Sequence, residues 1–178
     1  MLKQGMVIYY VQYCVGDFNL IPIFSVLFLP GMILGLAIAP IFTKRFDSKT
    51  LFIGSRIFGI VVDVIFFFAG FSNIPLTMFL YALTSIPLGI SSVVSATMLT
   101  NTIEYAEWKF GNRQEGLISS TQTLTAKIGM ALSVGVTGLV LQIANYVPNQ
   151  VQTHETQMMI HGAFTLFCAV VGLLGIIP

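Results

Sequence analysis

The stretch Leu117–Tyr146, LISSTQTLTAKIGMALSVGVTGLVLQIANY, decides how the rest of the chain is interpreted, because it carries a single charge in thirty residues. A helix over this stretch would place Lys127 about 15 Å from Leu117, at about 1.5 Å of rise per residue. That distance is half of the hydrocarbon thickness of a bilayer, which is about 30 Å. An ammonium group at this depth costs at least about 2.5 kcal/mol on insertion scales, so we expect Lys127 to face a polar cavity or a partner.

Polar side chains surround Lys127 on the same predicted helix. Thr123 lies four residues before Lys127 and therefore shares its face. Further hydrogen-bond donors and acceptors, one to two turns away, come from Ser119, Ser120 and Gln122. This pattern favours a pathway for a polar solute. The alternative is a lysine that snorkels from a lipid-facing helix, but snorkelling requires a nearby interface.

The composition excludes an ordinary soluble domain. Hydrophobic residues make up 56% of the chain and charged residues 8%, whereas about 25% of the residues of a globular domain are charged. The mean hydropathy is +0.88. The net charge of +1 gives no electrostatic basis for binding nucleic acid. The chain is therefore predicted to be a polytopic, all-α membrane protein.

Six apolar segments separated by polar connections are the candidate membrane spans: residues 1–16, 19–42, 51–71, 74–99, 117–146 and 158–178. The first is shorter than the about 20 residues that a span needs, so it is interpreted as the end of a longer span. In the second segment, Gly31, Gly35 and Ala39 recur at every fourth residue and predict a ridge for close helix contact.

Two charged residues interrupt the third segment. Asp63 lies seven residues after Arg56, so the two share a helix face. Asp63 is either a proton- or ion-linked carboxylate or a structural hydrogen-bonding acid, and the sequence leaves both open. In the fourth segment, Ser91 and Ser92 either line a hydrated cavity or bond back to their own helix.

The sequence contains no nucleotide-binding loop, HExxH motif, Ser-His-Asp candidate or glycine-rich phosphate cradle, so we expect no enzymatic activity. His154, Glu155 and His161 are close in sequence, but their places in a loop and at a helix entrance favour interfacial positions over a metal site. Cys14 and Cys168 lie in apolar segments without metal-ligand spacing and are expected to be packing residues.

The basic residues predict the orientation of the chain. By the order of the spans they fall on one side of the membrane, which the positive-inside rule assigns to the cytoplasm. These residues are Lys3, Lys44, Arg45, Lys49, Lys109 and Arg113. The chain is thus expected to lie in the plasma membrane with both termini in the cytoplasm.

Three segments carry a resemblance to a known family: YYVQYCVGD at Tyr9–Asp17, TIEYAEWKFGNRQEGLISSTQTLTAKIG at Thr102–Gly129, and YVPN at Tyr146–Asn149. They resemble the glycoside–pentoside–hexuronide:cation symporters. The resemblance implies the C-terminal six-helix half of a major-facilitator fold, without its N-terminal half. It implies sugar:cation symport by alternating access between the two halves.

The resemblance also implies roles for particular residues. The sugar-binding positions would be Gln122, Thr123, Ala126 and Lys127, and Lys127 would pair with acids of the other half. The residues of a cytoplasmic latch between the halves would be Glu104, Glu107 and Arg113, for which the alternative is a solvated, charged connector. One departure is Ser92, which stands where some members of the family have a tryptophan.

The expected partners are a sugar, a coupling cation (Na⁺ or H⁺) with its ligands mostly in the N-terminal half, the lipid bilayer and that half itself. No resident cofactor and no nucleic acid are expected. The sequence leaves open which sugar and which cation are used, and whether the chain is a fragment, a truncated product or one part of a two-chain assembly. Two other functions are a major-facilitator half for a different solute and a non-transporting membrane module.

Overall fold

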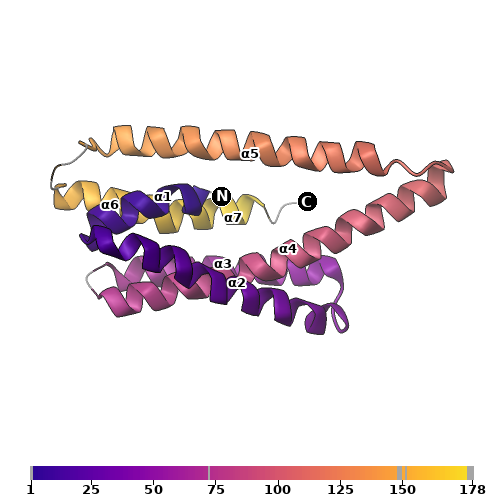
Figure 1. Cartoon of the computed structure of the whole chain (residues 1–178), viewed down its shortest axis with the longest axis horizontal. Helices are drawn as coiled ribbons and strands as arrows, with labels where there is room; N and C mark the ends of the chain where they lie inside the picture. The colour runs from indigo at the N-terminus through magenta and orange to yellow at the C-terminus, as the bar shows by residue number, and fades with distance from the viewer. Residues whose placement is uncertain (1, 72, 148–149, 151, 176–178) are drawn as a thin grey trace.

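The computed structural model describes residues 2–71, 73–147, 150 and 152–175, and every regular element in these ranges is a helix. The elements are α1 (Leu2–Tyr10), a π-helical turn (Val11–Val15), a short 3₁₀ turn (Phe18–Leu20), α2 (Ile21–Thr43), α3 (Ser48–Ala69), α4 (Ile74–Phe110), α5 (Glu115–Ile143), α6 (His154–Gly162), a second π-helical turn (Ala163–Phe167) and α7 (Cys168–Leu174). The helices run along one long axis (Figure 1). The prediction of an all-α helical bundle is confirmed.

Five helical segments in these ranges are long and apolar enough to cross a membrane: Phe18–Thr43, Ser48–Ala69, Ile74–Phe110, Glu115–Ile143 and His154–Leu173. The predicted first span at 1–16 is a helix of nine residues followed by a five-residue π turn, and Met1 lies outside the described residues. Of the predicted last span at 158–178, residues 176–178 also lie outside them.

Helix α4 is longer than a bilayer requires. Its 37 residues correspond to about 55 Å, against a hydrocarbon thickness of about 30 Å. The helix continues into the polar connection predicted at 100–116 and ends at Phe110. Gly111, with a φ of 70°, follows as the residue that terminates it. The predicted latch residue Glu107 thus lies on a rigid helix rather than in a loop.

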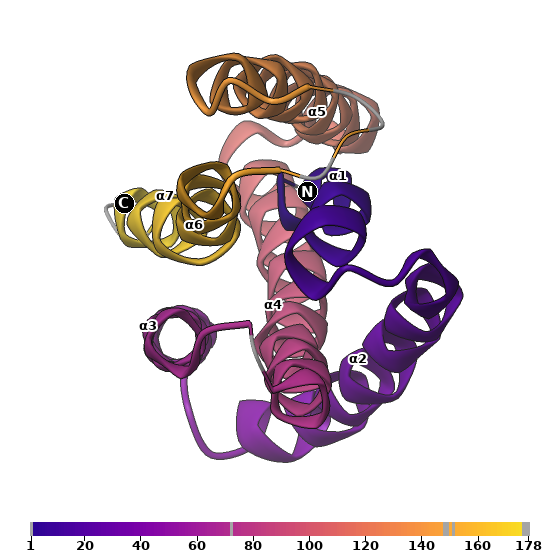
Figure 2. The same ribbon diagram turned by 90° about the vertical axis from the view of Figure 1, so that its left-hand side faces the viewer.

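The closest helix contact joins α2 to α4, which cross one another (Figures 1 and 2). Gly31, Gly35 and Ala39 lie buried on one face of α2, as the sequence predicts. A Cβ atom on Gly35 would collide with the carbonyl oxygen of Ile86 and lie 3.0 Å from the Cα atom of Gly89. The two backbones are therefore in direct contact, which larger residues at these positions would prevent.

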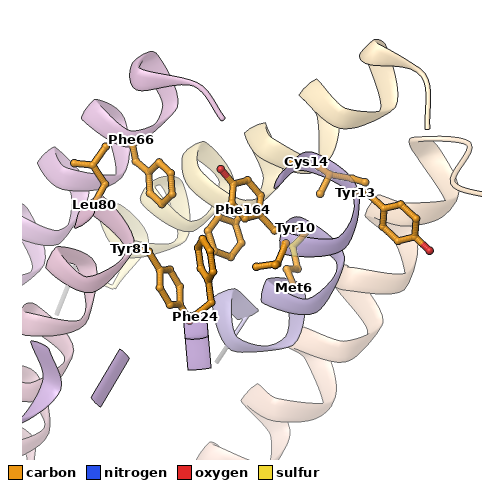
Figure 3. Close-up of a cluster of buried hydrophobic side chains, with 11 residues drawn as sticks. Met6, Tyr10, Tyr13, Cys14, Phe24, Phe66, Leu80, Tyr81 and Phe164 are labelled. Carbon is orange, nitrogen blue, oxygen red and sulfur yellow. The ribbon is translucent and has the colours of Figure 1, made fainter. Parts of the chain in front are cut away.

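An aromatic cluster joins α1 to the remaining helices (Figure 3). The rings of Tyr10 and Phe164 stack with centroids 4.3 Å apart and an interplanar angle of 8°. His161 is 1% exposed, and its Nε2 atom lies 3.1 Å from the carbonyl oxygen of Phe67. His161 packs against aromatic rings inside the bundle, and its interfacial depth in the membrane stays a prediction.

An ion pair also fixes α1 against α3. Lys3 Nζ donates to Asp63 Oδ1, and the two side chains are 12% and 13% exposed. Asp63 lies fifteen residues after the first residue of α3, about 22 Å along the helix. The prediction that Lys3 lies among the cations of the loops is wrong, because Lys3 lies on α1 and pairs with Asp63 inside the bundle. Lys3 is also the partner of Asp63 that the sequence leaves unidentified.

The α2–α4 contact can be tested by comparing two glycine substitutions. Gly35→Ala should lower the free energy of unfolding by about 1–3 kcal/mol, because the added methyl group forces two backbones apart. Gly54→Ala is the matched control, since a Cβ there meets no atom within 4 Å and removing a helical glycine stabilises by up to about 1 kcal/mol. Thermal unfolding in detergent measures both, and equal midpoints for the two variants would contradict the contact.

The ion pair can be tested with a double-mutant cycle of Lys3→Gln and Asp63→Asn. Each single variant leaves a buried charge without its partner and should lose about 3–5 kcal/mol, whereas the double variant should lose less than the sum. The exposed pair Glu107→Gln and Arg113→Gln is the control, with an expected coupling of about 0–1 kcal/mol. Additive losses for Lys3 and Asp63 would show that they do not interact.

Candidate functional site

The predicted sugar-binding residues lie on α5, a helix that is exposed along most of its length. Gln122, Thr123, Ala126 and Lys127 are all exposed. Helix α5 packs on α1 through its C-terminal half, where Thr137 is buried beside Gly5. Figure 2 shows α5 along one edge of the bundle, apart from α2 and α3. The N-terminal half of α5 is therefore uncovered by the described part of this chain.

The uncovered residues continue the face that packs on α1. Gln122, Ala126, Ser133 and Thr137 follow at spacings of four, seven and four, which puts them on one side of α5. The hydroxyl of Thr123 donates to the carbonyl oxygen of Ser119 at 2.9 Å, so its lone pairs stay free to accept a hydrogen bond. This face is a stripe of small and polar groups at the edge of the bundle.

Lys127 lies near the middle of α5. It follows the first residue of the helix by twelve positions, about 18 Å, and the helix has 29 residues. The ion pairs among the described residues do not include Lys127. The structure thus brings the four predicted residues together on one helix, and it places no carboxylate of the described chain against the amine.

The predicted latch residues lie where α4 passes into α5. Arg113 Nη1 is 3.6 Å from Glu107 Oε2, and Arg113 Nε donates to Glu115 Oε2 at 3.1 Å. All three side chains are well exposed. Glu115 was not among the predicted latch residues. The feature of the sequence that could have identified it is its position two residues after Arg113. Glu104 is exposed one turn before Glu107 and forms no ion pair with another described residue.

A second polar region lies inside the bundle. A partly open cavity of about 180 Å³ lies between α1, α3, α4 and α7, and its polar lining consists of Lys3, Ser55, Arg56, Asp63, Thr84 and Ser91. The prediction that Arg56 and Asp63 share a face is confirmed, because both line this cavity. Ser91 also lines it and lies 3.0 Å from Ser55 between the hydroxyl oxygens, whereas Ser92 donates to its own helix at the Gly89 carbonyl.

Metal-binding groups are not gathered at either region. Within the ranges that the structure describes, no three His, Cys, Asp or Glu side chains are placed to hold a metal ion. Cys14 and Cys168 are free thiols, the first buried and the second half-buried. Cys14 lies in the hydrophobic cluster, as the sequence predicts for a packing residue, whereas Cys168 lines the polar cavity.

Comparison with known proteins gives a consistent result over the whole chain. The model of the family described as "MFS/sugar transport protein" matches residues 1–178. The chain is 31% identical over 170 residues to an uncharacterized symporter, YjmB, of Bacillus subtilis, covering 95% of this chain and 37% of that protein. It is 31% identical over 163 residues to a glucuronide carrier protein homolog of Escherichia coli, covering 89% of this chain and 35% of the relative.

A third relative is an isoprimeverose transporter of Lactiplantibacillus pentosus, 29% identical over 154 residues, covering 86% of this chain and 32% of that protein. The chain therefore spans about a third of the length of these relatives. They are named as transporters and not as enzymes. Taken with the apolar helices that are long enough to cross a bilayer, these matches show that the chain belongs to the MFS/sugar transport protein family of integral membrane transporters.

Proposed function

We propose that this chain is the C-terminal half of a sugar:cation symporter and that α5 contributes the face of Gln122, Thr123, Ala126 and Lys127 to the sugar site. The observation that carries the proposal is that this polar face is uncovered in the middle of a helix long and apolar enough to span a membrane. An amide, a hydroxyl and an ammonium group can donate to and accept from the hydroxyls of a sugar, and the small Ala126 leaves room for a ring.

The names of the relatives support a glycoside, pentoside or hexuronide as the substrate class. One relative is a glucuronide carrier homolog and another an isoprimeverose transporter. In major-facilitator transporters the substrate site lies between two six-helix halves that rock against each other. The uncovered face of α5 is in this proposal the surface that the N-terminal half closes on.

Lys127 connects sugar binding to the coupling cation in this mechanism. Since a charge at mid-membrane depth requires compensation, we assign its partner to carboxylates of the N-terminal half, which also hold Na⁺ or H⁺. Binding of the cation changes the charge that Lys127 meets, and so changes the preference between the inward- and outward-facing states. Asp63 already pairs with Lys3, and we therefore assign it the structural role.

The arrangement of loops supports the orientation proposed for the plasma membrane. The basic connections α2–α3 and α4–α5 lie at the same end of the bundle (Figure 1). We assign this end to the cytoplasm, because basic loops are retained there. Arg113 with Glu107, and the nearby Glu104, which pairs with no cation of the described residues, would then form the cytoplasmic latch with the N-terminal half.

The sugar site can be tested in a protein in which this chain is joined to a complementary N-terminal half. Uptake of a labelled glucuronide or xyloside is then measured with and without sodium. Lys127→Ala should reduce uptake by about tenfold or more, since a charged hydrogen bond to substrate or carboxylate is worth about 1.5–3 kcal/mol. Lys49→Ala, at an exposed position in the first turn of α3, is the matched control and should transport normally.

The same assay separates the alternative functions. Normal uptake by Lys127→Ala, at equal amounts in the membrane, would remove this lysine from the mechanism. Uptake of a non-sugar solute alone would point to a transporter of another substrate. Binding of a sugar without uptake by the joined protein would favour a non-transporting module.

The latch can be tested by reversing charges. Arg113→Glu should slow uptake severalfold, because a loss of about 1 kcal/mol in one conformational state changes its population about fivefold. Combining it with Glu107→Arg should restore much of the rate, since the charges are again complementary. Uptake that stays low in the double variant, or does not fall in the single one, would leave the solvated connector as the better description.

A further inference from the structure

The cavity between α1, α3, α4 and α7 is separate from the α5 face and contains more positive than negative charge. Its ionisable lining residues are Lys3, Arg56, Asp63 and Cys168. We propose that this cavity binds a compact monoanion through the guanidinium of Arg56. The inference does not rest on the proposed function, because it concerns residues that play no part in the α5 site.

The charges on the cavity wall support an anion. Lys3 and Asp63 neutralise each other in their ion pair. Arg56 forms no ion pair with another described residue, and its Nε atom is buried without a hydrogen-bond partner. Its guanidinium lies over the ring of Phe52, with Cζ 5.0 Å from the ring centroid. A guanidinium in an apolar helix bundle therefore lacks the counter-charge that such a group requires.

The hydrogen-bonding groups of the cavity also match an acceptor ligand. Arginine has five N–H donors and no acceptor, and the ammonium of Lys3 has donors beyond the one used on Asp63. Ser55 donates its hydroxyl proton to the carbonyl oxygen of Phe52 at 2.8 Å. The hydroxyl proton of Ser91 can therefore be donated either to the Ser55 oxygen or to a ligand. Arg56 and Ser91 come from the facing helices α3 and α4, and they offer donors from two sides.

The size of the cavity limits the ligand. Its volume of about 180 Å³ is below the roughly 300–1,000 Å³ of pockets for drug-sized molecules. A halide, a nitrate or one acidic group of a larger molecule would fit. Arg56 lies eight residues after Ser48, about 12 Å along α3. At this depth the anionic group could come from either of two sources. One is a free anion from water, and the other is the phosphate of a membrane lipid.

The first experiment measures thermal unfolding of the full chain in a neutral detergent while chloride replaces gluconate at constant ionic strength. The unfolding midpoint should rise with chloride and saturate. Arg56→Gln should abolish the rise, Arg56→Lys should keep part of it, and the loop variant Arg45→Gln should behave as the unmodified chain. Asp63→Asn releases Lys3 and should lower the half-saturating chloride concentration by about tenfold.

A second arm replaces chloride with phosphatidylglycerol in the same detergent, with native mass spectrometry to count bound lipid. Stabilisation by this lipid alone, lost in Arg56→Gln, would support the anion site and identify the lipid phosphate as its source. The proposal is overturned if neither anion raises the midpoint, or if Arg56→Gln responds as the unmodified chain does. If Arg56→Gln fails to fold, crystals of the unmodified chain can be soaked in bromide instead. An anomalous peak beside Arg56 supports the anion site, and the absence of a peak there at saturating bromide refutes it.

Discussion

The constraint on which this structure depends is that a charge inside an apolar helix bundle must be compensated by something close to it. Lys3 and Asp63 satisfy it within the chain, sixty positions apart in sequence and paired between α1 and α3. This pair, with the stacked rings of Tyr10 and Phe164, holds the short α1 against the bundle.

The helices divide into a tightly packed group and one that is loosely attached. Helices α2 and α4 touch through their backbones at Gly35 and Gly89, where no side chain can intervene. Helix α5 instead meets α1 through the C-terminal half of its length and leaves the polar half uncovered. In the function proposed above, this exposed helix is the one that would contact the second half of the transporter.

Local patterns in the sequence predict the features that depend on helical spacing alone. The buried ridge of Gly31, Gly35 and Ala39 and the shared face of Arg56 and Asp63 follow from spacings of four and seven residues. Features made by residues far apart in the chain could not be predicted in this way. The pairing of Lys3 with Asp63, the burial of His161 and the cavity around Arg56 depend on which helices become neighbours, and periodicity within one helix carries no information about that.

Lys127 and Arg56 form no ion pair with another described residue. They differ in the space around them, and this difference indicates what can compensate each. Lys127 lies on an open face, so another protein segment can reach it and can leave it again. Arg56 lines a small, partly open cavity between α1, α3, α4 and α7. When two halves rock against each other, contacts between them change while contacts within each half persist. In the proposed transport cycle, Lys127 would therefore change its charged partner, whereas Arg56 would keep the small anion proposed for its cavity.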